Sequence, residues 1–579
     1  MKLIINSITT CILLLLATAC SESFLERTPK GILSEEQLST PENAEKMVIA
    51  AYSAQGKEKY YLHPLTPWPY GDLRGGDAYK GGAGVGDLPE WNIAETFSNM
   101  TTDEAGVQGK WNVEYNTISR TNLALGILNK MTDDQMPNKT MRIAEMRFLR
   151  SNNYFWLKVN FKHVPFIDET VPVDQYNTVG NDLGDQELWN KIIDDLRFAA
   201  ENLPATHADG AVGRPTKYAA KAYLAKVLLF AAYEQNATHE VIHINKEKLT
   251  EVVALCQDVV SSSGKALFND FGDNFGCETQ NGIESLWAIQ FSHDDGTPRG
   301  NINGTTMVSY PMVAEYGCCG YHSPSQNLVN VFRTKNGLPD FDNYNTVNIN
   351  GAQGVKANPV DPRLLHTVAM DGVPYKYKAD FIFNEKTWTR QYETYGGFMS
   401  MKETVIYDSP CYQPVNPWKD SSKNRDVLRM DDVILWLAEA LIQLDRPNEA
   451  LPLINQIRER AAKSTGKLVD VKGMPTGNFD IKPYIATGAG KNIDWSKATA
   501  FKALQWERRL EFACEGFRAY DLMRWGIMAE TINQYFQVEK TRRPHLASAS
   551  FTKGRDEFLP IPKKQIDLSK GLYKQNTGY

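Results

Sequence analysis

The chain has 579 residues, 42% of them hydrophobic and 23% charged, so it is long enough to bury one large core or several smaller ones. Its 63 basic and 69 acidic residues give a formal net charge of −6. This mild acidity argues against a nucleic-acid-binding protein, because such proteins gather Lys and Arg into patches that meet the phosphates. No Pro/Ser-rich linker or charge block divides the sequence, and we expect one large domain with elaborated loops over residues 20–579.

The first 19 residues are typical of a signal peptide. Lys2 is their only charge, and the apolar stretch that follows is shorter than the roughly 20 residues that cross a bilayer. The small residues before Cys20 resemble a bacterial lipobox, which predicts a lipid on Cys20 and a membrane-anchored protein. Secretory cleavage beside an incidental cysteine is the alternative. Loss of Lys2 leaves 62 basic and 69 acidic residues, a net charge of −7.

Residues 60–92 are predicted to form an irregular loop with a binding surface. Seven glycines lie between Gly71 and Gly86, in neither the P-loop nor the dinucleotide pattern. We expect them to give the loop positive φ angles. Aromatic side chains can cover the C–H face of a sugar ring while Asp and Arg bind its hydroxyls. The candidate ligand-binding residues of this loop are Trp68, Tyr70, Asp72, Arg74, Asp77 and Trp91. For each aromatic, packing beneath the loop is the alternative.

Helical periodicity marks the next part of the chain. It predicts helices around 141–159, 215–235 and 246–263. The second is nearly apolar all round from Ala222 to Tyr233, which predicts that it is buried on every side.

The segment from His239 to His243 fits the H-E-x-x-H pattern of zinc hydrolases. On a helix, this spacing would place both imidazoles on one face, with Glu240 as the general base. The glycine and third histidine of the longer pattern are absent, and the segment follows the end of a predicted helix. A surface connection is therefore the favoured interpretation, and we expect no metal site or cofactor.

Residues 264–424 are rich in Gly, Asn, Pro and aromatics and poor in helical periodicity. Binding residues concentrate on such loops when a rigid scaffold carries them. The candidates here are Tyr316, Tyr321, Trp388 and Tyr392. Six cysteines follow Cys20, and their irregular spacing leaves the disulfide pairing open, including the state of Cys318 and Cys319.

A pair of antiparallel helices is predicted near residues 425–461. The first has an apolar stripe from Met430 to Leu441, and Pro447 is placed to open the second. Two such helices joined by a short turn resemble a tetratricopeptide unit, although the strict repeat consensus is absent.

The segment 507–526 reads Glu-Arg-Arg-Leu-Glu-Phe-Ala-Cys-Glu-Gly-Phe-Arg-Ala-Tyr-Asp-Leu-Met-Arg-Trp-Gly. Leu510, Ala513, Phe517 and Tyr520 predict the buried seam of one scaffold helix. Opposite charges three apart, such as Arg508/Glu511 and Asp521/Arg524, predict a ladder of ion pairs on its surface. The segment resembles the signature near the C-terminus of the SusD/RagB family of Bacteroidetes.

The ends of the chain resemble the same family. Phe24-Leu25-Glu26-Arg27-Thr28-Pro29 resembles the opening of its mature members, and Phe558–Pro562 with Gln575–Tyr579 resembles its closing motif. The resemblance implies a mainly α fold, with a tetratricopeptide-like scaffold over roughly 30–263 and 425–535. The ligand face would occupy roughly 60–92 and 264–424.

The resemblance also implies a function. Members of the family are outer-membrane lipoproteins that capture oligosaccharides and deliver them to a SusC-like TonB-dependent transporter. We therefore expect a non-catalytic, cell-surface glycan-binding lipoprotein, with no nucleic-acid partner. Two alternatives remain open: a helical-repeat scaffold that binds only proteins, for which Trp68, Trp91 and Trp388 would be packed, and a zinc hydrolase built on His239, Glu240 and His243.

Overall fold

The computed structural model describes residues 39–56, 68–297, 300–304, 308–414 and 419–579, and over these residues the fold is mainly α-helical. The helices are α4 (Pro41–Gly56), α5 (Trp68–Gly75), α6 (Pro89–Thr96), α7 (Ala105–Lys130), α8 (Lys139–Phe161), α9 (Asp185–Asn202), α10 (Lys217–Ala232), α11 (Lys246–Ser262), α12 (Gln326–Val331), α13 (Gly351–Ala357), α14 (Arg363–Thr367), α15 (Glu385–Trp388), α16 (Tyr392–Tyr395), α17 (Met430–Gln443), α18 (Pro447–Lys463), α19 (Lys497–Phe512), α20 (Arg518–Arg524), α21 (Met528–Arg542) and α22 (Lys563–Leu568). The signal peptide, Cys20 and the 24–29 motif lie outside the described residues.

The strands are short and pair two by two. They are β1 (Ala78–Gly81), β2 (Tyr233–Gln235), β3 (Val241–Ile244), β4 (Ser285–Ile289), β5 (Tyr321–Pro324), β6 (Thr334–Lys335), β7 (Leu338–Pro339), β8 (Pro359–Val360), β9 (Val368–Ala369), β10 (Pro374–Tyr375), β11 (Lys378–Ile382), β12 (Met399–Ser400), β13 (Tyr412–Gln413), β14 (Asp420–Ser421), β15 (Arg425–Arg429) and β16 (Asn478–Phe479). Within the described ranges, each forms a two-stranded sheet: β1–β5, β2–β3, β4–β15, β6–β7, β8–β16, β9–β12, β10–β11 and β13–β14.

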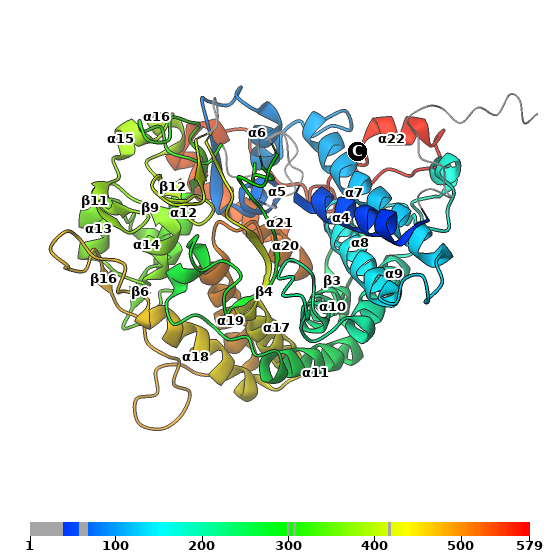
Figure 1. The fold of residues 1–579 in the computed structure, drawn as a ribbon. Helices are drawn as coiled ribbons and strands as arrows, with labels where there is room; N and C mark the ends of the chain where they lie inside the picture. The colour runs from blue at the N-terminus through cyan, green and yellow to red at the C-terminus, as the bar shows by residue number, and fades with distance from the viewer. Residues whose placement is uncertain (1–38, 57–67, 298–299, 305–307, 415–418) are drawn as a thin grey trace, which may run out of the picture.

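The long helices pack side by side in one continuous array. Helix α7 packs on α4 and α8, α9 on α8 and α10, and α11 on α10 and α17, which in turn packs on α18 and α19. Figure 1 shows this array following the right and lower sides of the molecule, with the short elements α12–α16 on the other side. The predicted helices at 141–159, 215–235 and 246–263 correspond to α8, α10 and α11. The mainly α fold is therefore confirmed.

The predicted helical pair at 425–461 is α17 and α18, joined by a tight turn. Pro447 is the first residue of α18, as its fixed φ and missing N–H favour. Asp445 in the turn has a φ of 64°, and its carboxylate binds Lys497 Nζ at 2.7 Å. The pair resembles the tetratricopeptide arrangement that the sequence predicts.

The prediction of an irregular loop over 60–92 is wrong for residues 68–75, which form helix α5. Every side chain of α5 is buried, because the helix packs against α20. A Cβ on Gly71 would lie 1.8 Å from the carbonyl oxygen of Gly516. The two backbones therefore approach each other more closely than any side chain at residue 71 would permit.

The signature segment is not one continuous helix either. Helix α19 ends at Phe512, and α20 begins only at Arg518. Between them, Cys514 and Gly516 have φ angles of 61° and 79°. The seam residues Leu510, Ala513 and Tyr520 are buried as predicted, whereas Phe517 is half-buried.

Five of the eight charged residues of the signature are buried, and most have distant partners. The expected Asp521–Arg524 pair is present, with its atoms 2.8 Å apart. Glu511, however, binds Arg363 and Arg460, while its expected partner Arg508 binds Asp521. The predicted surface ladder is therefore replaced by buried ion pairs.

The last residues of the described chain bind segments from its first third. Arg74 Nη2 donates to the Glu557 carbonyl at 2.9 Å, and the buried Asn576 amide donates to the carbonyls of Phe161 and Leu559 at 2.9 and 2.7 Å. The Tyr579 hydroxyl donates to the Phe558 carbonyl at 3.2 Å. These bonds fix the last residues against helix α8 and the N-terminal part of the array.

Four of the six cysteines left open by the sequence are paired. Cys277 binds Cys411, and Cys318 binds its neighbour Cys319. Cys256 and Cys514 are buried free thiols. Within the described ranges, every helix is too short or too polar to span a bilayer.

Candidate ligand-binding face

The structure places nearly all the predicted ligand-binding residues inside the protein. Nine of the ten have at most 7% of their surface exposed: Trp68, Tyr70, Asp72, Arg74, Asp77, Trp91, Tyr316, Tyr321 and Trp388. Only Tyr392 is half-buried. In this conformation, the nine buried side chains offer almost no surface to a ligand. Their positions agree with the alternative interpretation, in which the aromatic side chains pack beneath the loops.

Three of the predicted aromatics form one cluster. The Trp68 and Trp91 rings meet edge to face with centroids 4.9 Å apart, and Trp91 meets Tyr321 in the same way at 5.4 Å. The cluster joins two distant segments because β1 pairs antiparallel with β5, Tyr79 facing Ser323. Trp68, Trp91 and Tyr321, predicted separately from the sequence, are thus in contact in the fold, although they lie beneath the surface.

The centre of this cluster is His322, which the sequence analysis missed. Its ring stacks on Trp68 with centroids 4.4 Å apart, and its Nε2 lies 2.9 Å from Asp72 Oδ2. Burial opposes the charged imidazole, but the carboxylates of Asp72 and Glu403 outweigh it and raise the pKa of His322 to about 9. Asp72 Oδ1 accepts from the Gly516 N–H at 2.9 Å, so this pair also holds the loop against the signature segment.

The other predicted polar residues also support the fold. Arg74 binds backbone carbonyls near the C-terminus, as described above, and Asp77 forms an ion pair with Arg509 at 2.7 Å. Tyr70 belongs to the main core. None of these groups is directed to solvent. The two charged side chains have partners inside the protein, as the burial of a charge requires.

Tyr316 and Trp388 lie in a second aromatic cluster. Tyr316 stacks on Tyr310 with centroids 4.9 Å apart, and Trp388 packs on Phe381 at 4.6 Å. The Tyr316 hydroxyl donates to the Val405 carbonyl at 3.0 Å. Through Trp388, the segment 385–395 packs against this cluster.

Four polar residues adjoin these clusters, and we name Asp87, Glu385, Arg390 and Tyr392 together the rim. Arg390 Nη1 binds Asp87 Oδ2 at 3.2 Å, which joins the glycine-rich turn 81–88 to the segment between α15 and α16. Lys80 Nζ donates to the carbonyls of Gly84, at 2.8 Å, and Asp87. Burial lowers the pKa of Lys80 to about 8. The buried Lys80 therefore fixes the backbone of the turn that carries Asp87.

Tyr392 completes the rim. Its hydroxyl donates to Glu385 Oε1 at 3.1 Å, and its helix α16 contacts β1. The rim thus offers hydrogen-bond donors, acceptors and one aromatic side chain. Asp87, Glu385 and Arg390 are not among the predicted site residues; the available signal was their position among the predicted aromatics and the glycines.

The H-E-x-x-H segment does not have the geometry of a zinc hydrolase. It lies in the β2–β3 hairpin, not on a helix. His239 is buried, with Nδ1 3.3 Å from Lys162 Nζ, whereas His243 is exposed and binds Glu234 at 2.9 Å. The two imidazoles therefore have separate environments. The favoured interpretation, a surface connection, agrees with this hairpin.

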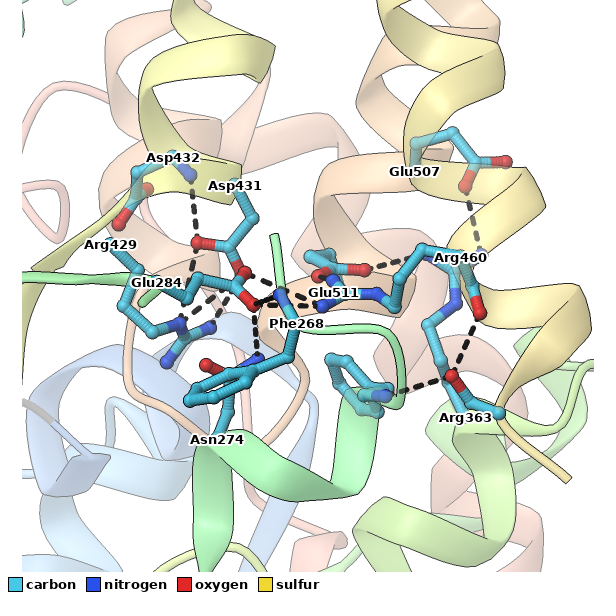
Figure 2. A network of polar contacts seen from close by, with 12 residues as sticks. Phe268, Asn274, Glu284, Arg363, Arg429, Asp431, Asp432, Arg460, Glu507 and Glu511 are labelled. Carbon is cyan, nitrogen blue, oxygen red and sulfur yellow. Dashed lines mark hydrogen bonds and ion pairs between the residues drawn. The ribbon is translucent and has the colours of Figure 1, made fainter. Parts of the chain in front are cut away.

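A buried ion network beneath the face contains three clustered carboxylates. Oxygens of Glu284, Asp431 and Glu511 all lie within 4.8 Å of one another. Figure 2 shows guanidinium groups among them: Arg460 binds Glu284 at 3.1 Å and also Glu511, and Arg429 binds Asp431 at 2.9 Å. Burial raises the pKa of Glu284 and Glu511. Because arginines already supply the positive charge, this network joins β4 to α17–α19 as a structural element.

Two family models match the chain. A model described as "SusD family" matches residues 283–579, about half of the chain, and one described as "Starch-binding associating with outer membrane" matches residues 24–229. Among curated proteins, SusD-like protein P25 of Formosa agariphila is 22% identical over 609 residues and covers 99% of both chains. A SusD-like protein of Bacteroides ovatus is 28% identical over 282 residues, 48% of each chain.

Solved structures share the fold. A SusD homolog from Bacteroides thetaiotaomicron superposes with a TM-score of 0.70 at 19% identity, covering 94% of this chain and 98% of the other. Surface glycan-binding protein A from the same species, in complex with laminarihexaose, gives 0.65 at 18%, covering 93% and 99%. The helical array, the signature segment and these matches agree, and the chain belongs to the SusD family.

Proposed function

We propose that this protein is a cell-surface glycan-binding lipoprotein that captures oligosaccharides without cleaving them and passes them to a TonB-dependent outer-membrane transporter. The observation that carries this proposal is the family match over half of the chain, together with a fold shared with a protein solved in complex with laminarihexaose. The mildly acidic net charge of −6 and the absence of a nucleotide-binding motif in the sequence agree with a neutral sugar ligand.

The rim is the part of the loop face that we assign to ligand contact. Asp87, Arg390 and Glu385 are positioned to bind hydroxyls, and Tyr392 to cover a sugar ring. The buried Trp68, Trp91 and Tyr321 then shape the site from below, since their cluster holds the β1–β5 pair and the glycine-rich turn.

Isothermal titration of the mature protein against a panel of oligosaccharides tests this function. We expect at least one glycan to bind, and Arg390→Ala to weaken its binding by about tenfold or more, about 1.4 kcal/mol. The matched control is Arg446→Ala, because Arg446 also forms an exposed ion pair, with Glu449 at 2.6 Å, but on the scaffold. Failure of a properly folded protein to bind any member of a broad panel would contradict the proposal.

Membrane attachment and delivery have their own test. Cys20→Ala should release the protein from the membrane fraction, and an affinity purification from the native membrane should recover a TonB-dependent transporter. Recovery of the unmodified protein in the soluble fraction would show that Cys20 carries no lipid.

A protein-interaction scaffold is the second candidate function. It is favoured by the packing of Trp68, Trp91 and Trp388, which are buried as this alternative predicts. The two candidates differ in the titration: a scaffold would recover a protein partner yet bind no glycan, and Arg390→Ala would change nothing.

A further inference from the structure

A cavity of about 270 Å³ lies on the helical array, apart from the rim and its two aromatic clusters. Its walls come from the end of α8, the start of α9, the α10–β2 junction and α20. Figure 1 places α8, α9 and α10 on the right of the molecule and the α15–α16 segment at the upper left. Asp185 and Ala237 in its lining are exposed at the surface.

The cavity is basic although the whole protein is acidic. Lys158, Lys162 and Arg524 line it, whereas Asp185 is its only lining carboxylate. Lys158 Nζ is bound to Asp185, so their charges cancel. Arg524 is held by two carboxylates behind the wall, one of them Asp521 at 2.8 Å.

Lys162 is the cation left over. Within the described part of the chain, no carboxylate oxygen lies within 4.0 Å of its Nζ, and its nearest polar contact is His239 Nδ1 at 3.3 Å. Burial lowers the pKa of Lys162, and burial together with the neighbouring lysines lowers the pKa of His163 to about 4 and of His239 to about 3. Both imidazoles are therefore neutral at pH 7, and an anion beside Lys162 would relieve the electrostatic cost of this arrangement.

The rest of the wall is aromatic. Trp189, Phe230, Tyr233, Tyr520 and Phe558 line it. Lys162 Nζ lies 5.5 Å from the centroid of the Phe558 ring, so the charged end of the cavity adjoins an aromatic surface. This pairing of one cation with flat apolar walls suits a ligand that has a ring with C–H faces and one negative group.

We propose that this cavity binds a single anionic sugar unit, its carboxylate or sulfate at Lys162 and its ring against Phe558. With a volume of about 270 Å³, the cavity is suited to one sugar unit rather than a long chain. The proposal concerns a site separate from the rim, so it stands or falls independently of the glycan-capture function proposed above.

The test compares galacturonate, galactose 6-sulfate and galactose in titrations of the mature protein. At least one of the two anionic sugars should bind at least tenfold more tightly than galactose, and which of them binds identifies the group. Lys162→Gln should remove this preference. The matched control is Lys265→Gln, because Lys265 is also half-buried and lines a second cavity, of about 240 Å³. Arg390→Ala at the rim should leave the preference unchanged.

A second measurement does not depend on any variant. His163 faces Lys158, Lys162 and Asp185, so a bound anion should raise its pKa, which NMR titration of its C2 proton reports. The proposal would be overturned if galactose bound as tightly as both galacturonate and galactose 6-sulfate. An unchanged pKa of His163 in the presence of the two anionic sugars would overturn it as well. Inorganic sulfate binding as tightly as galactose 6-sulfate would refute the role of the aromatic wall.

Discussion

At the residue scale, His322 shows how a charge is kept inside a hydrophobic cluster. The imidazole is fully buried, stacks on Trp68, and is paired with Asp72 at 2.9 Å and with Glu403 at 3.7 Å. Two carboxylates favour its protonated form strongly enough to overcome burial. The charged form is therefore part of the folded state at neutral pH.

This pairing makes stability depend on pH. The pKa of His322 is raised from 6.5 to about 9, so its contribution is fully present below pH 6.5 and is lost as the pH rises through 9. At 1.36 kcal/mol per pKa unit, the free energy of unfolding should fall by about 3 kcal/mol over this window. Urea unfolding at several pH values should show that His322→Gln lacks this decrease. The exposed His243→Gln serves as control, and an unchanged pH profile in His322→Gln would contradict the assignment.

The ligand-binding candidates show what residue types can and cannot predict. Aromatics among glycines indicated the right segments, since Trp68, Trp91 and Tyr321 do meet. The same composition serves packing as well as binding, so the sequence could not tell which side of the loop the rings face. His322 was out of reach because its partner Asp72 lies 250 positions away.

At the scale of elements, apolar periodicity predicted the long helices, whereas elements that depend on contacts between distant segments were not predicted. Helices α8, α10, α11 and α17 follow their apolar patterns, and Pro447 opens α18. Helix α5 and the break after Phe512 were not predicted, because both depend on a contact between distant segments. The backbones of Gly71 and Gly516 touch there. No pattern within either segment encodes that contact.

The contact between α5 and α20 should be intolerant of a single methyl group. Gly71→Ala places a Cβ 1.8 Å from a backbone oxygen, so we expect a loss of about 1–3 kcal/mol or more in the free energy of unfolding. Gly126→Ala is the matched control: Gly126 lies within α7 with open space around its Cα, and alanine should stabilise the helix there by up to about 1 kcal/mol. Chemical denaturation measures both changes. Equal stability of the two variants would refute the close approach.

The disulfide between Cys277 and Cys411 ties η2 (Phe271–Phe275) to the segment before β13. It links residues 134 positions apart, so its removal should increase the entropy of the unfolded chain and cost about 2–5 kcal/mol. The double variant Cys277→Ala/Cys411→Ala tests this by denaturation. Cys256→Ala, which removes a buried free thiol, controls for the lost side-chain volume. A double variant as stable as the wild type under oxidising conditions would contradict the bond.

At the scale of the whole molecule, the two family models match separate halves, residues 24–229 and 283–579, yet the fold does not separate there. Helix α11 packs on both α10 and α17, and the C-terminal Asn576 binds the end of α8. The expectation of one domain came from the lack of an internal linker in the sequence, and these contacts agree with it; it stays a prediction.

Calorimetry should therefore record one cooperative unfolding transition. Asn576→Ala leaves the Leu559 carbonyl without its donor, and the Phe161 carbonyl keeps only the His163 N–H, which should cost about 1–3 kcal/mol and lower the temperature of that single transition. Two separate transitions, in the wild type or in the variant, would show that the halves fold independently.

The docked C-terminus has a practical consequence for anyone who labels this protein. Because Tyr579 is half-buried and hydrogen-bonded to Phe558, a tag or fluorophore fused directly after it would press on the residues that close the fold. The tight turn at 470–474, where Val471 and Met474 are 68% and 59% exposed, offers a better attachment point. A probe placed there would leave the rim, the basic cavity and both aromatic clusters untouched.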